Sequence, residues 1–338
     1  WLWEPQSTNL ITQSELFSDA SWRKANAIVS DNSTISVDGT QNATLIQSTT
    51  STSAFVAPNN LTLTIGNTYT FSCFAKKGNN DWIRLAHITS GGTGCWFDLE
   101  NGVVGTVNSQ SATIEDYGNG WYKCTNTFIA TTSTGANLVF IGICDADGST
   151  NAGIVGQNDY LWGAMLEQNS FSTSYIPTSG STVTRNRDFC NNGGSLASIN
   201  STSGVLYAEI AALANDLSFR SIGLSDGTVN NRILILYTDA SNGIRVLIFR
   251  NNLLQVIENH TINITNVNKV AVRYKQNDVT FWVNGVKLST DTNAFMPIGL
   301  NQLSFSRGDG DLPFFGKTKA LAVFPYLTDA ELTELTTI

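Results

Sequence analysis

The sequence predicts an all-β protein made of two tandem antiparallel β-sandwich (jelly-roll) domains with a short C-terminal helix. First, apolar residues recur at every second position in several runs, which is typical of strands with one buried face. The clearest runs are 69–75, 121–128, 205–210 and 269–274. Second, Gly, Asn and Asp cluster between the runs, as expected for turns. Third, 338 residues exceed the usual size of a single hydrophobic core.

The boundary between the domains is predicted near Thr182, which gives a first domain of residues 1–181 and a second of residues 182–338. The stretch 168–192 is rich in Ser and Thr and contains Pro177 and Gly180. This composition is typical of turns and linkers. We therefore expect the chain to leave the first sandwich in this stretch.

Two local signals define elements of the second domain. Asn284-Gly285 lies between two apolar segments and predicts a hairpin, since a type I′ turn needs positive φ at both central residues. The segment Leu327 to Leu335 predicts a helix, with Thr328 as N-cap and Glu331 as its capping-box partner. The leucines of this helix are expected to hold it against the second sandwich.

The charge balance argues against nucleic acid as a partner, and the hydropathy argues against a membrane. Charged residues make up 14% of the chain and the formal net charge is -8. Residues 1–185 carry 7 Lys and Arg against 14 Asp and Glu, so the acidity belongs to the first half. No cluster of Lys and Arg exists to bind a phosphate backbone, so nucleic acid is not an expected partner. No stretch is apolar over the roughly 18 residues that a membrane helix needs, so membrane insertion is not expected either.

The five cysteines are widely spaced and form no CxxC pair, which argues against a zinc site. Cys73 and Cys144 lie on alternating, strand-like runs and are interpreted as small buried apolar residues. A disulfide between two of the first four, Cys73, Cys95, Cys124 and Cys144, stays an open alternative.

Trp82 and Trp96 are the candidate ligand-binding residues, because an indole ring can stack on the C–H face of a sugar. Both lie beside polar residues that favour an outward position. The alternative is burial, which is the usual environment of a large apolar ring. Trp121, Trp162 and Trp282 lie within strand-like runs and are expected in the core.

Asp145 and Asp147 are the candidate metal ligands, since Ca²⁺ prefers several oxygens from carboxylates, amides and the main chain. The segment 145–151 begins like a calcium loop but lacks the later bidentate Glu of an EF-hand. The alternative is an Asp-Gly turn that caps a hairpin. The segment Arg307 to Asp311 carries the same two interpretations. Calcium is the one cofactor that these residues suggest.

No catalytic residue is predicted, and the chain is not expected to be an enzyme. Gly223-Leu-Ser225-Asp-Gly227 matches the pattern of hydrolase nucleophiles, which works at a strand-to-helix elbow beside a histidine base. A strand-like run follows here, so a hairpin turn is the better interpretation. Asp98 and Glu100 share one strand face, but they lack the further carboxylates of sandwich-fold glycosidases.

Several segments resemble known families. The segments 160–168 and 173–185, with Gly118 to Cys124, are similar to the carbohydrate-binding-module-like jelly roll of phage tail-fibre and virion structural proteins. The segments 281–285 and 315–332 resemble the laminin-G or concanavalin-A-like lectin fold. No sugar-contacting residue can be transferred by motif.

The resemblance implies a non-enzymatic virion or surface appendage that binds a glycan or receptor, or that decorates a capsid or tail. Its partners would be a cell-surface glycan or other virion subunits, and a homo-oligomer is expected. The location implied is the virion surface or tail, or the extracellular space. The alternative is the accessory carbohydrate-binding region of a secreted polysaccharide-degrading enzyme.

Overall fold

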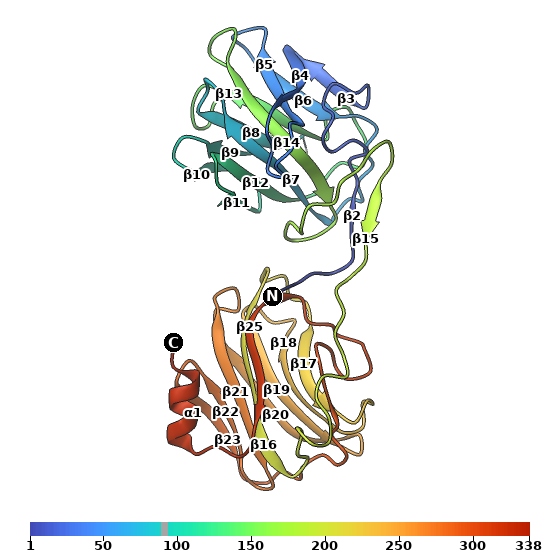
Figure 1. Cartoon of the computed structure of the whole chain (residues 1–338), viewed down its shortest axis with the longest axis vertical. Helices are drawn as coiled ribbons and strands as arrows, with labels where there is room; N and C mark the ends of the chain where they lie inside the picture. The colour runs from blue at the N-terminus through green and yellow to red at the C-terminus, as the bar shows by residue number, and fades with distance from the viewer. Residues whose placement is uncertain (89–93) are drawn as a thin grey trace. The chain divides into compact units, whose positions relative to one another are not determined.

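The computed structural model describes residues 1–88 and 94–338, which form 25 strands and one short helix (Figure 1). Every strand pairing is antiparallel apart from one isolated parallel bridge between Ser221 and Pro313. The predicted all-β class, with two antiparallel sandwiches and a C-terminal helix, is therefore confirmed. The chain divides into two compact units, Gln6–Asn186 and Trp1–Pro5 with Arg187–Ile338. We call them the N-terminal sandwich and the C-terminal sandwich.

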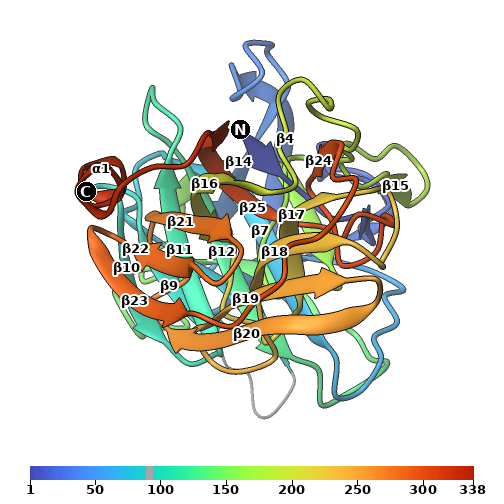
Figure 2. The ribbon, with the colours of Figure 1, turned by 90° about the horizontal axis from the view of Figure 1, so that it is seen from below.

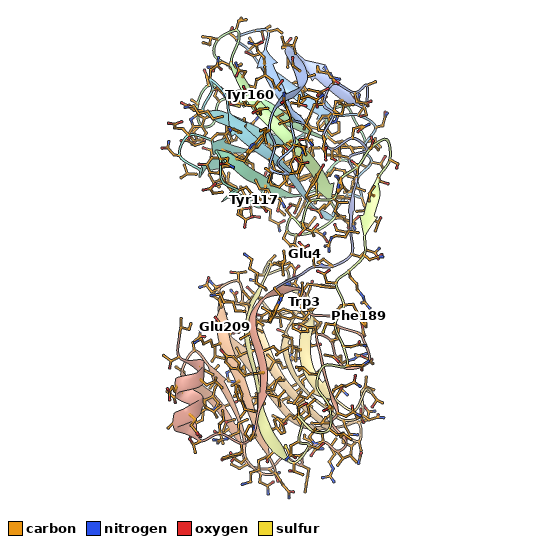
Figure 3. All side chains as sticks on the ribbon, viewed as in Figure 1. Trp3, Glu4, Tyr117, Tyr160, Phe189 and Glu209 are labelled. Carbon is orange, nitrogen blue, oxygen red and sulfur yellow. The ribbon has the colours of Figure 1, made fainter. Side chains whose placement is uncertain are left out.

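The division differs in two details from the predicted domains of residues 1–181 and 182–338. Strand β15 (Val183–Arg185) pairs with β2 (Ser7–Asn9), so residues after 181 still belong to the N-terminal sandwich. Strand β1 (Leu2–Trp3) pairs with β25 (Gly316–Phe324), so the first five residues belong to the C-terminal sandwich. The Trp3 ring, labelled in Figure 3, stacks on Phe305 in that unit with ring centroids 4.2 Å apart.

The N-terminal sandwich consists of two six-stranded sheets with its largest apolar cluster between them. The first, which we call the β8 sheet, has the order β10-β9-β8-β13-β6-β3. The second, the β7 sheet, has the order β11-β12-β7-β14-β5-β4. The strands are β3 (Trp22–Ala25), β4 (Ala27–Thr34), β5 (Ala43–Ser48), β6 (Ala54–Pro58), β7 (Thr68–Lys77), β8 (Trp82–His87), β9 (Gly94–Asp98), β10 (Val103–Val107), β11 (Ser111–Asp116), β12 (Trp121–Ile129), β13 (Val139–Cys144) and β14 (Asn158–Glu167).

The C-terminal sandwich packs a six-stranded sheet, β1-β25-β16-β21-β22-β23, against a five-stranded sheet, β20-β19-β18-β17-β24 (Figure 2). The strands not yet given are β16 (Ser203–Ala212), β17 (Arg220–Ser225), β18 (Arg232–Tyr237), β19 (Gly243–Arg250), β20 (Leu253–Thr261), β21 (Asn268–Lys275), β22 (Val279–Val283), β23 (Val286–Asp291) and β24 (Gln302–Ser304).

The two local predictions in this sandwich are confirmed. Asn284 and Gly285 join β22 to β23 with φ values of 50° and 81°, as a type I′ turn requires. Helix α1 (Asp329–Thr336) has Thr328 as N-cap and a complete capping box with Glu331. Leu332 is fully buried and packs the helix on the outer side of the six-stranded sheet, where Trp282 also lies.

The hydrolase-like pattern lies in a hairpin. Ser225 is the last residue of β17, it is fully buried, and the chain returns antiparallel as β18. It therefore lacks the strand-to-helix elbow that exposes a hydrolase nucleophile.

Cys73 and Cys144 are buried as predicted, Cys95 and Cys124 are buried as well, and all five cysteines are free thiols in this structure. Cys73 and Cys124 lie directly opposite each other on β7 and β12. Burial raises the pKa of both thiols well above its usual value, which keeps them protonated and unreactive.

Candidate functional site

The outer face of the β7 sheet carries a second apolar layer outside the main core. Phe71 and Cys73 of β7 face the core, so the alternation of the strand turns Phe74 outward. Phe74 forms a buried cluster with Trp121 of β12 and Trp162 of β14. Both tryptophans are thus buried as predicted, but on the outer side of the sheet.

Two segments cover part of this aromatic cluster. In the segment 168–181, the Tyr175 ring packs on Trp162 with centroids 4.5 Å apart, and its hydroxyl donates to Glu15 Oε1 at 2.8 Å. In the β4–β5 loop, the main-chain oxygen of Ile35 accepts a hydrogen bond of 3.1 Å from Trp121 Nε1. These contacts fix the positions of both tryptophans.

A cleft of about 360 Å³ lies beside the cluster, where the covering segments leave the face open. This volume falls at the lower end of the range for small-molecule sites. The cleft is bounded by the β4–β5 loop, by β7 and by the turn between β11 and β12. We call it the Tyr117 cleft, and its lining residues are Thr34, Ile35, Ser36, Val37, Gly39, Lys76, Tyr117, Gly118, Asn119 and Trp121.

The turn that forms one wall of the cleft has an unusual backbone. Gly118, Asn119 and Gly120 have successive φ values of 80°, 55° and 78°. Only Gly and, less readily, Asn adopt this left-handed region at low cost, which explains the Gly-Asn-Gly sequence. The turn reverses the chain so that the main-chain N–H of Tyr117 donates to the oxygen of Trp121 at 2.9 Å.

Tyr117 is the more exposed of the two aromatic residues that line the cleft. It is 45% exposed, whereas Trp121 is 2% exposed. The Tyr117 ring meets Phe74 edge-on with centroids 4.9 Å apart, so the aromatic cluster supports it from behind. Tyr117 and Tyr160 are labelled in Figure 3.

Among the residues that line the cleft, Lys76 alone has a charged side chain. Strand pairing places it directly between Trp121 on β12 and Tyr160 on β14. Its ammonium group has no hydrogen bond or ion pair with residues 1–88 or 94–338. The next residue, Lys77, pairs instead with Asp81 at 2.6 Å and Glu100 at 2.5 Å.

A second hollow of about 320 Å³ lies near Asn32, toward the same end of β4, and most of the side chains that line it carry amides or hydroxyls. Its carboxylate, Glu15, accepts hydrogen bonds from Asn42 Nδ2 at 3.1 Å and from the Tyr175 hydroxyl. Because Glu15 is already engaged and no aromatic ring lines the hollow, it offers less for ligand recognition than the Tyr117 cleft.

The predicted ligand residues Trp82 and Trp96 lie on the other sheet, facing away from the main core. Trp96 is 3% exposed and its indole N–H donates to the main-chain oxygen of Ser149. The buried Arg84 guanidinium lies between the rings of Trp96 and Phe140, at 5.5 and 4.9 Å from their centroids. The Trp96 ring therefore presents no open face to a sugar, while Trp82 is half-buried and its role stays a prediction.

The predicted metal residues Asp145 and Asp147 lie in the β13–β14 connection. Asp147 accepts hydrogen bonds from the main-chain N–H and the hydroxyl of Thr106 on β10, at 2.7 and 3.0 Å. Because β13 and β14 belong to different sheets, this connection is not a hairpin, and Asp147 links it to a neighbouring strand instead. Arg307 is paired with Asp309 and Asp311 within its own loop. Within the described part of the chain, no three His, Cys, Asp or Glu side chains gather to hold a metal ion. Calcium binding stays a prediction.

Sequence analysis used Gly118 to Cys124 for a family resemblance and assigned no function to Tyr117 or Lys76. The alternation of β7 carried a usable signal, because it places Lys76 on the same face as Phe74. The register that brings Trp121 and Tyr160 beside Lys76 comes from pairing between distant segments.

No protein-family model matches the sequence, and no curated protein matches it. Among solved structures, the chain is similar to the LG4-5 domains of the mouse laminin alpha1 chain, with 10% identity and a TM-score of 0.26. That match covers 82% of this chain and 92% of the laminin chain. The assignment of the fold rests on the strand pairing of this chain alone. Among the described residues, no helix has the length and apolar character needed to cross a bilayer.

Proposed function

We propose that this chain is a non-enzymatic recognition protein whose N-terminal sandwich binds a saccharide in the Tyr117 cleft. The observation that carries the proposal is an exposed tyrosine ring beside Lys76 and Asn119 in a cleft of about 360 Å³. The C–H face of a pyranose stacks on the Tyr117 ring, while its hydroxyls bond to the polar groups around it.

The lining of the cleft suits a sugar better than an apolar ligand. Asn119, Ser36 and the main chain of the β4–β5 loop offer both donors and acceptors. The rigid aromatic cluster behind Tyr117 holds the ring in place, so little side-chain entropy is lost on binding.

A single shallow site of this kind binds weakly, and several copies on one particle would add avidity. This fits an oligomeric appendage on a virion surface or tail, or on another extracellular surface, which is the setting implied by the phage-like segments of the sequence. The lectin-like C-terminal sandwich would then present a second surface to a glycan or to neighbouring subunits.

A glycan array followed by calorimetric titration of the best ligand tests the proposal. Tyr117→Ala should weaken binding about 10-fold, because it removes an aromatic stacking surface. Tyr326→Ala is the matched control, since Tyr326 is 40% exposed but lies in the C-terminal sandwich. Thermal unfolding is measured for both variants, because Tyr117 contacts Phe74 and Tyr326 donates to Asp278, and each should remain folded at the temperature of the binding assay.

Binding that survives Tyr117→Ala unchanged would exclude the cleft as the site. No signal on the array at high protein concentration would exclude saccharide binding altogether. A catalytic domain encoded in frame with this chain would assign it instead to the accessory region of a polysaccharide-degrading enzyme.

A further inference from the structure

Lys76 differs from the other three lysines of the N-terminal sandwich. Residues 6–186 contain 7 Lys and Arg against 13 Asp and Glu, so carboxylate partners are plentiful. Lys77 uses two of them, and Lys123 and Lys24 donate to main-chain oxygens. Lys76 has no such partner among the described residues, although it lies in the same acidic unit.

The surroundings of Lys76 hold its side chain in place but supply no counter-charge. Its neighbours across β12 and β14 are aromatic, and the side chain is half-buried between them. Aromatic rings supply no hydrogen-bond acceptor of full strength, so the ammonium group stays available to an anion that enters the cleft. Since no carboxylate lines the cleft, no anionic side chain among the lining residues competes for Lys76.

From this arrangement we infer that the Tyr117 cleft selects an anionic saccharide, one that carries a carboxylate or a sulfate. The inference rests on the proposed function and adds the class of sugar to it. The sugar ring stacks on Tyr117, and its anionic group pairs with Lys76, which acts as a point charge without preference for a planar, bidentate group. Asn119 and the β4–β5 loop are left to bond the remaining hydroxyls.

Matched saccharide pairs test the inference, because each pair shares one skeleton and differs in charge. Oligogalacturonate and its methyl ester test the carboxylate, sialyllactose and its methyl ester test a carboxylate on a second skeleton, and carrageenan oligosaccharides and their desulfated forms test the sulfate. At least one acidic member should bind the parent protein about 10-fold or more tightly than its neutral partner, the effect expected of one charged hydrogen bond. Raising the salt concentration should weaken the acidic member only.

Three variants separate the role of Lys76 from general charge effects. Lys76→Gln should remove the preference for the acidic member, while Lys76→Arg should keep it. Lys77→Gln is the matched control, since it removes the same charge one residue away but outside the cleft. It should bind both members like the parent protein.

The outcomes distinguish this inference from the proposed function. If neutral members bind as tightly as acidic ones, and Tyr117→Ala weakens both, saccharide binding stands and the anionic preference is overturned. A preference for the acidic member that survives Lys76→Gln would likewise overturn the role of Lys76. If no member of any pair binds, both proposals fail.

Discussion

Asp159 gives the N-terminal sandwich a stability that depends on pH. The residue is fully buried at the start of β14, where its carboxylate accepts hydrogen bonds from Asn80 Nδ2 at 2.8 Å and from the Gly78 N–H at 3.2 Å. Burial raises the pKa of this carboxyl from 3.8 to about 7, because the ionised form loses its hydration. The two hydrogen bonds and Lys77 lower the pKa, and Asp81 raises it further, but burial is the largest cause.

The sign of the effect follows from proton linkage. Between about pH 4 and pH 7 the folded sandwich holds a proton on Asp159 that the unfolded chain has lost. The free energy of unfolding therefore falls as the pH rises through this window, by about 1.4 kcal/mol for each pH unit. The total loss is at most about 4 kcal/mol, it is absent below about pH 4, and it is complete above about pH 7.

Urea unfolding of the parent protein and of Asp159→Asn between pH 4 and pH 8 measures this effect. The difference between the two free energies cancels the other titrating residues. Between pH 5 and pH 8, the free energy of unfolding of the parent protein should fall by about 3 kcal/mol relative to that of the variant. The C-terminal sandwich is an internal control, since its unfolding should not differ between the two proteins. A difference that stays constant to within about 0.5 kcal/mol over this range would refute the raised pKa.

Three further substitutions should change stability in stated directions, measured by differential scanning calorimetry. Arg84→Met should leave the N-terminal sandwich unchanged or raise its stability by up to about 2 kcal/mol, because it removes a buried charge without a carboxylate partner among the described residues. A loss above about 1 kcal/mol would show that its aromatic contacts outweigh desolvation. Thr328→Ala should lower the stability of the C-terminal sandwich by about 1 kcal/mol, because it removes the helix cap. An unchanged stability would contradict the capping box. Gly285→Ala should cost about 1–2 kcal/mol, since φ is 81° and the new Cβ would lie 2.9 Å from Thr337 Oγ1. An unchanged transition would contradict that turn geometry.

The features that the sequence predicted correctly are local ones. The hairpin at Asn284-Gly285 needs two residues that accept positive φ, and the capping box of α1 needs Thr328 and Glu331 three positions apart. The alternation in β7 and β12 likewise depends only on near neighbours. Each of these signals lies within about ten residues, so it can be recognised without knowing which strands pair.

The features that the sequence could not predict depend on contacts between distant segments. Residues 1–5 look like the start of the first domain, but β1 pairs with a strand more than 300 residues away. Alternation shows that Phe74 and Lys76 share a face, but not that this face is the outer one. The outer face is the one that Tyr175 covers where it packs over Trp162, and the segment that carries Tyr175 has the composition of a linker.

The candidate site illustrates why an aromatic residue is hard to interpret from its neighbours in sequence. Trp96 lies among small and polar residues, yet Arg84 and Phe140 of the same sheet leave it without an open face. Tyr117 lies beside a tight turn, and its exposure follows from that turn and from the edge position of β11.

The position of the Tyr117 cleft follows from where the covering of the aromatic cluster ends. Tyr175 covers the part of the outer face that contains Trp162, and this part contributes to stability alone. Lys76 lies two residues beyond Phe74 on the same strand face, where the covering gives way to the open cleft. One row of aromatic side chains therefore serves as packed interior at one end and as the support of a binding surface at the other. Substitutions at Tyr175 act on folding, whereas substitutions at Tyr117 and Lys76 act on the proposed ligand, so the two roles can be separated by mutation.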